Sequence, residues 1–156
     1  EVAGATVAAI GAGRVGIRLS PHGVFNGTGG FADADGQYLA LTRSLSGLGL
    51  RYLHLLDHSA MGAPPVPAAL KADLRDAFKG IFILAGGFDR DSAEAALDAG
   101  QADLIAFGKL FISNPDLVER LKLGAPLNPF DKATFYGGGA KGYTDYPALG
   151  QQAAAE

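Results

Sequence analysis

The chain has 156 residues, 48% hydrophobic and 19% charged, which is enough for one domain with a buried core. Its 13 basic and 16 acidic residues give a net charge of −3, which argues against a nucleic-acid partner because such proteins need a basic face. No apolar run approaches the roughly 20 residues that span a bilayer, so no membrane partner is expected, and the lack of cysteine excludes disulfides and cysteine nucleophiles.

Strand patterns alternate with helical patterns along the chain. Strands are predicted over residues 14–20, 52–56, 81–85 and 103–107. Helices are predicted over residues 2–10 and from about residues 38, 67, 91 and 114 onward. Asp33 and Asp35 are candidate caps of the helix around residue 38, and Asn114 followed by Pro115 is typical of a helix start. The alternation indicates an α/β fold with a parallel sheet and right-handed crossovers.

The two ends of the chain differ from its middle. Residues 2–10 begin a helical pattern without a preceding cap, and after Gly124 the pattern gives way to an aromatic, glycine-rich tail. We therefore expect a half-barrel over residues 1–124 and a tail over residues 125–156. Four strand–helix units can form an open sheet, or half of a (β/α)8 TIM barrel, which needs eight units and about 250 residues. The start inside a helix favours the half-barrel and hence a fragment.

Arg18 is the first candidate for chemistry. Val15, Ile17 and Leu19 share one face of the first strand, and Arg18 lies on the other face. If the apolar face meets the helices, Arg18 points into a barrel near the strand ends, where barrel enzymes hold their active sites. The alternative is a structural arginine of an open sheet, paired with a nearby carboxylate. The strand alone does not decide between the two.

Two glycine turns follow consecutive predicted strands. Gly86 and Gly87 end the third strand, and Gly108 and Lys109 follow the fourth. Glycine lets backbone N–H groups approach an anion, and the loops after the last two strands of a (β/α)8 barrel are a recurrent phosphate site. Lys109 would add a positive charge. One such turn carries little weight, but two in succession predict phosphate binding.

The three histidines are weaker candidates. His22 stands at a strand end, where it could line the mouth of a pocket, whereas His54 is in mid-strand and is interpreted as a core histidine with satisfied hydrogen bonds. His58 lies beside Asp57 and Ser59, but these three are too close in sequence to form a triad by spacing alone. No set of His, Asp or Glu has metal-ligand spacing, so no metal is expected.

Six stretches match one known family in the same order along the chain. They are residues 14–23, 85–88, 107–109, 112–117, 135–140 and 142–147. The Asn-Pro-Asp-Leu element at residues 114–117, combined with Tyr-Thr-Asp-Tyr-Pro at residues 143–147, is specific. Together they resemble the Old Yellow Enzyme family of FMN-dependent ene reductases, over about residues 2–149. The resemblance implies a (β/α)8 TIM barrel to which this chain contributes strands five to eight.

The resemblance also implies roles for single residues. Arg18 would stand against the pyrimidine edge of the flavin, where its fixed charge stabilises negative charge near N1 and C2=O of reduced FMN. The residues that would hold the FMN phosphate are Gly86, Gly87, Gly108 and Lys109. The family usually has Arg at the position of Lys109. The lysine keeps the positive charge but lacks the planar guanidinium that forms two parallel hydrogen bonds with a phosphate. Tyr136 would form an aromatic wall of the substrate pocket.

The activity and partners follow from the same resemblance. NADPH or NADH would reduce FMN, and a hydride would pass from flavin N5 to an activated alkene such as an α,β-unsaturated carbonyl compound. The family's substrate-binding histidine pair and proton-donating tyrosine lie around strand four, so we expect no catalytic residue in this chain, a complementary chain with the N-terminal half-barrel, and a cytoplasmic location. The alternative is a non-catalytic half-barrel that binds phosphate or assembles through its open sheet edges.

Overall fold

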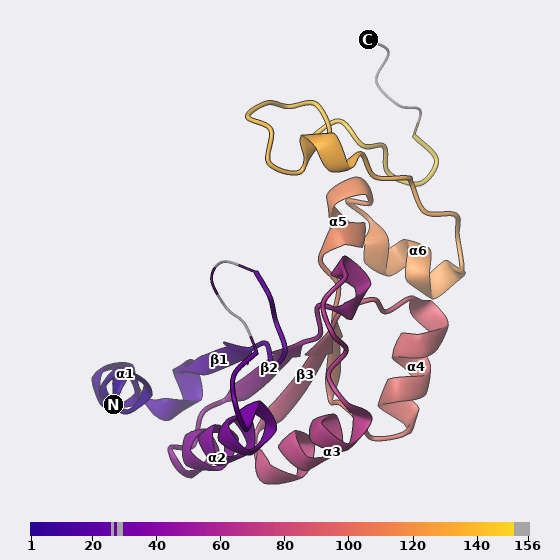
Figure 1. Ribbon diagram of the computed structural model, residues 1–156. Coiled ribbons are helices and arrows are strands. Elements are labelled where there is room, and N and C mark those ends of the chain that lie inside the picture. The colour runs from indigo at the N-terminus through magenta and orange to yellow at the C-terminus, as the bar shows by residue number, and fades with distance from the viewer. Residues whose placement is uncertain (26, 28–29, 152–156) are drawn as a thin grey trace. The chain divides into compact units, whose positions relative to one another are not determined.

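The computed structural model describes residues 1–25, 27 and 30–151, in which strands and helices alternate (Figure 1). The strands are β1 (Gly16–Leu19), β2 (Tyr52–Leu56), β3 (Ile81–Ala85) and β4 (Leu104–Ala106). The α-helices are α1 (Val2–Ile10), α2 (Ala34–Gly47), α3 (Ala68–Ala77), α4 (Arg90–Asp98), α5 (Lys109–Ser113) and α6 (Leu117–Leu123). Short 3-10 helices are η1 (Ala12–Arg14), η2 (Ser59–Met61) and η3 (Lys132–Thr134). The predicted α/β fold is confirmed.

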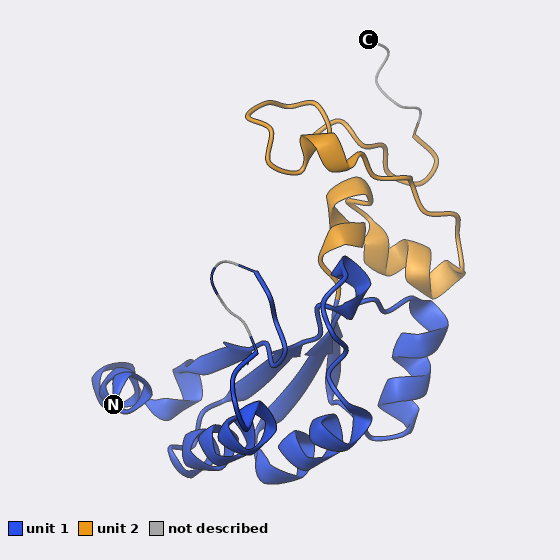
Figure 2. Ribbon diagram, viewed as in Figure 1, with its two compact units in different colours: residues 1–106 blue, residues 107–156 orange. Residues whose placement is uncertain are grey.

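The chain divides into two compact units, residues 1–106 and residues 107–156 (Figure 2). Unit 1 contains the four strands with α1 to α4, and unit 2 contains α5, α6 and the tail. The sequence places a boundary at residue 124 instead, where the helical pattern ends. That division into a half-barrel and a tail remains a prediction.

Unit 1 is built on a parallel sheet with the strand order β1-β2-β3-β4. One row of register partners runs across all four strands and consists of Arg18, His54, Ile83 and Leu104. Strands that follow one another in space as they do in sequence are the pattern of a (β/α)8 barrel, whereas a doubly wound sheet reverses its order at a switch point. The topology therefore agrees with a barrel segment.

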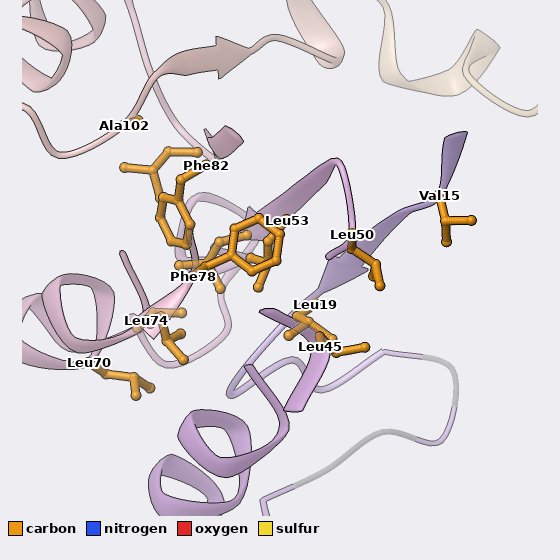
Figure 3. Close-up of a cluster of buried hydrophobic side chains, with 13 residues drawn as sticks. Val15, Leu19, Leu45, Leu50, Leu53, Leu70, Leu74, Phe78, Phe82 and Ala102 are labelled. Carbon is orange, nitrogen blue, oxygen red and sulfur yellow. The ribbon is translucent and has the colours of Figure 1, made fainter. Parts of the chain in front are cut away.

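One face of this sheet packs against α2 and α3. Figure 3 shows Leu53 and Phe82 of the strands gathered with Leu45 of α2 and Leu74 of α3, and both strand residues are fully buried. Burying a large apolar side chain of this kind stabilises the fold by about 2 kcal/mol. Because side chains alternate between the two faces of a strand, the burial of Leu53 and Phe82 identifies the face that meets the helices.

The opposite face of the sheet is open. By alternation it carries Gly16 and Arg18 of β1, Tyr52 and His54 of β2, and Leu104 of β4. Tyr52 is 40% exposed and Leu104 is 51% exposed, which is unusual for large apolar groups on a central parallel sheet. We call this surface the open face.

Gly16 and Tyr52 form a tight pair on the open face. A Cβ at Gly16 would overlap the ring of Tyr52. We expect Gly16→Ala to destabilise the chain by about 1 kcal/mol, because the ring must swing away and lose its contacts. In urea unfolding, the double variant Gly16→Ala with Tyr52→Ala should cost less than the sum of the two single variants. Additive costs would show that the ring does not rest on this glycine.

Some predicted helix starts are wrong. α6 begins at Leu117 with Asp116 as N-cap, so Asn114 does not cap it. Asn114 instead ends α5, where its fully buried side chain accepts the N–H of Asn128 at 2.7 Å. Asp33 is the N-cap of α2, as predicted, but its side chain makes no capping hydrogen bond.

Candidate functional site

Arg18 projects from β1 onto the open face, and its side chain is exposed. Among the described residues no carboxylate forms an ion pair with it. The alternative interpretation, in which Arg18 is a structural arginine paired with a carboxylate, is therefore wrong for this part of the chain. An unpaired guanidinium on a sheet face can bind an anionic or electron-rich group through up to five N–H donors.

His54 is the register partner of Arg18 on β2. Its Nε2 atom is buried and has no hydrogen-bond partner within the described residues, so the interpretation of His54 as a satisfied core histidine is wrong. Burial, and in second place the charge of Arg18, lower the pKa of His54 from its usual 6.5. The ring is therefore neutral at pH 7 and does not add to, or cancel, the charge beside it.

Gly86 and Gly87 form the turn after β3, with φ angles of 120° and 72°. A Cβ at Gly86 would overlap the carbonyl oxygen of Asp57, and one at Gly87 would lie 3.2 Å from Cβ of Ala60. The fold of unit 1 therefore requires glycine at position 86 whether or not a ligand binds there.

Asp57 fixes the loop that follows β2. Its buried carboxylate accepts the backbone N–H of Ser59 at 2.9 Å and that of Val66 at 3.3 Å, and lies 2.7 Å from Nζ of Lys71. Burial raises the pKa of Asp57, but the hydrogen bonds from Lys71 and Ser59 and the charge of Lys71 outweigh it and leave the pKa below 3.8. Asp57 thus acts as a structural anchor.

The expectation that residues 57–59 form no triad agrees with these contacts. The carboxylate of Asp57 bonds Ser59 through the backbone and Lys71 through the side chain. His58 packs edge-on against the ring of Phe25, with the ring centres 5.1 Å apart, and its buried Nδ1 has no hydrogen-bond partner in the described part of the chain. These contacts do not place His58 between Asp57 and Ser59, as a triad requires.

A cavity of about 490 Å³ opens at the carboxyl end of β1. Ser20, His22, Phe31 and Tyr38 are among the residues that line it. His22 has a φ of 59°, rare for a residue other than glycine, and its Nε2 lies 2.7 Å from Oδ1 of Asp35 on α2. The sequence placed His22 at the mouth of a pocket, and the structure places it in the wall of this one.

In unit 2, Gly108 precedes α5 with a φ of −110°. A Cβ there would meet no described atom within 4 Å, so the fold of this unit does not require glycine at that position. The Nζ of Lys109 lies 4.9 Å from the centre of the Phe130 ring, which is a cation–π contact. No local pattern indicates this contact, because residues 109 and 130 lie far apart in the sequence.

Tyr136 lies in the tail of unit 2, and its side chain is 97% exposed. Its expected place in the wall of a substrate pocket stays a prediction. Tyr146 differs, because its hydroxyl oxygen accepts the backbone N–H of Asp131 at 3.0 Å and so joins two parts of the tail. Tyr143 is 66% exposed.

The described residues contain neither a cluster of metal-binding side chains nor a membrane-spanning helix. No group of three or more His, Asp or Glu side chains in these residues could hold a metal ion. None of the helices in this part of the chain is long and apolar enough to cross a bilayer.

Comparisons with known proteins support the predicted family. The NADH:flavin oxidoreductase / NADH oxidase family matches residues 1–128. 12-oxophytodienoate reductase 2 of Arabidopsis thaliana is 40% identical over 96% of this chain and 40% of its own length. A 12-oxophytodienoate reductase-like protein of Solanum lycopersicum is 39% identical over 96% of this chain and 40% of its own length.

Solved structures give the same result. Morphinone reductase superposes with a TM-score of 0.84 at 42% identity, over 93% of this chain and 39% of the other. The structure of its complex with tetrahydroNAD superposes with a TM-score of 0.81 at 41% identity, over 94% of this chain and 39% of the other. The chain thus spans about 40% of the length of these relatives. At the level of the family, these findings support FMN as cofactor and a nicotinamide as reductant. The chain belongs to the NADH:flavin oxidoreductase / NADH oxidase family, the Old Yellow Enzyme family that its motifs resemble.

Proposed function

We propose that this chain supplies the flavin-binding part of an NAD(P)H-dependent ene reductase, as strands five to eight of a (β/α)8 barrel. The observation that carries the proposal is Arg18, an exposed cation without a carboxylate partner among the described residues, on the open face of a parallel sheet. Its guanidinium is therefore available to a ligand, and the electron-rich edge of a flavin is one that it would bind.

When bound, FMN supplies hydride transfer between a nicotinamide and an activated alkene such as an α,β-unsaturated carbonyl compound. Arg18 would bind the pyrimidine edge and hold a fixed positive charge there, which favours the electron-rich reduced form. His54 beside it has a lowered pKa and remains neutral, so the charge of Arg18 is not cancelled. The chain would thus set the electronic properties of the cofactor while other residues bind the alkene.

The phosphate of FMN is assigned to the two glycine turns. In unit 1, Gly86 and Gly87 keep the backbone after β3 free of side chains. In unit 2, Gly108 leaves its backbone uncovered by described atoms, and Lys109 adds a charge. Approachable N–H groups and a cation each favour phosphate binding. Tyr136 is assigned to the wall of the substrate pocket, in keeping with its exposure.

A complementary chain is part of the proposal. The chain spans about 40% of the length of its relatives, and the open face leaves Tyr52 and Leu104 exposed. A half-barrel that carries strands one to four would cover these side chains and provide the substrate-binding residues that the family implies. The family resemblance also favours a cytoplasmic location.

The proposal is tested by flavin binding to the assembled protein. Native mass spectrometry should detect one FMN together with a second polypeptide of comparable size. Arg18→Met should weaken FMN binding at least about tenfold in a fluorescence titration, because a charge-assisted contact is lost. The control Arg43→Met removes an exposed arginine of α2 and should bind FMN like the wild type. Equal affinities of all three proteins would contradict the role of Arg18, and a self-assembly without flavin would favour the non-catalytic half-barrel.

A further inference from the structure

We propose that His54 is a positioning residue for Arg18, in which the ring Nε2 accepts a hydrogen bond from the guanidinium and holds it against the open face. The structure records no hydrogen bond between the two groups, and the proposed contact would form within unit 1. Its purpose, to present Arg18 to the flavin, rests on the proposed function.

The geometry brings an unused acceptor next to unused donors. Arg18 and His54 are register partners on neighbouring parallel strands, whose axes lie about 4.8 Å apart, and both point to the open face. The Nε2 of His54 is buried without a hydrogen-bond partner in the described residues. A buried polar atom without a partner destabilises a fold, so one that persists is expected to have an occasional or conditional partner. The guanidinium, with five N–H donors and no acceptor among those residues, is the adjacent candidate.

The chemistry of imidazole suits this role better than that of a carboxylate. The other side chains of this row, Ile83 and Leu104, are apolar, so Arg18 is the charged group that faces His54 in it. Burial and Arg18 both lower the pKa of His54, so Nε2 can carry a free lone pair. A neutral acceptor orients the guanidinium and leaves its charge intact, whereas a carboxylate would orient it and cancel the charge.

The contact can be tested without flavin, by NMR titration of the histidine rings in the 156-residue chain. Arg18→Met should raise the titration midpoint of His54 by several tenths of a pH unit or more, because the repelling charge and the hydrogen-bond donor are removed. Arg18→Lys keeps a charge and a donor and should restore most of the wild-type midpoint. Arg43→Met, which removes an exposed arginine of α2, is the matched control and should leave the midpoint of His54 unchanged. An unchanged His54 midpoint in Arg18→Met would overturn the proposal.

A second test measures the reduction potential and the binding of FMN in the assembled protein. His54→Gln keeps a neutral acceptor and should leave the reduction potential of FMN close to the wild-type value. His54→Asp introduces an ion pair with Arg18, so reduced FMN should bind about tenfold more weakly than in the wild type. Wild-type binding of reduced FMN by His54→Asp would overturn the proposed purpose of the contact. A wild-type protein that binds no FMN would refute the proposed function, and the NMR titration would then decide the contact alone.

Discussion

Replacement of Gly86 by alanine is expected to destabilise the chain by about 3 kcal/mol or more. The φ of 120° at this position is one that side chains rarely allow, and the new Cβ would overlap the carbonyl oxygen of Asp57, with the carbonyl carbon at 2.9 Å. The obstacle is backbone, which cannot rotate away as a side chain does. The backbone of Asp57 is also held in place, since its N–H donates to the carbonyl of Ala85 at 2.9 Å.

Gly108→Ala provides the matched control for Gly86→Ala. Its φ is −110°, and a Cβ there meets no described atom within 4 Å, so the free energy of unfolding should change by less than about 0.5 kcal/mol. Urea unfolding followed by circular dichroism measures both variants. A Gly86→Ala chain as stable as the wild type would show that residue 86 does not pack against the carbonyl of Asp57.

The two glycines look alike in the sequence but differ in what they indicate. Each follows a strand and belongs to a family motif. The fold of unit 1 explains glycine at position 86 completely, so its presence adds little to the prediction of a phosphate site. Gly108 has no such structural reason within its unit, and the phosphate interpretation rests more firmly on it and on Lys109. The φ angle and the neighbours of the missing Cβ distinguish the two cases.

Local patterns predicted much of unit 1 correctly. Residues 52–56 and 81–85 are strands both in the prediction and in the structure. The alternation around Arg18 placed that residue on the face opposite Leu19, where the structure has it. Such predictions succeed because alternation and helical spacing depend on residues close in sequence and on which side is buried.

Features that depend on distant residues were missed. Asn114 looked like a helix cap, but its partner is Asn128, and nothing near residue 114 announces that contact. α5 was not predicted, since its five residues are too short to show a helical period. The unpaired Nε2 of His54 follows from strand register, which a single strand does not reveal.

Lys71→Met is expected to destabilise the chain by about 2–3 kcal/mol at pH 7, since it leaves the buried carboxylate of Asp57 without its cation. The loop after β2 would lose its anchor at the same time, because Asp57 also holds the N–H groups of Ser59 and Val66. The control Lys79→Met removes an exposed lysine whose Nζ donates to the carbonyl of Asp76, and should change stability by less than about 0.5 kcal/mol.

The effect of Lys71→Met should depend on pH in a defined direction. The folded state lowers the pKa of Asp57 below 3.8, so the unfolded state takes up the proton first as the pH falls. The stabilisation by the ion pair is therefore fully present above pH 3.8 and is lost as the pH falls through the lowered pKa of the folded state. Urea unfolding at pH 7, 5, 4 and 3 should show a difference between wild type and variant that is largest at pH 7 and shrinks as the pH falls, because the unpaired carboxyl of the variant takes up a proton more readily than that of the wild type. A difference that stays the same down to pH 3 and below would mean that Lys71 stabilises the loop through packing of its methylene groups, and not through the charge of Asp57.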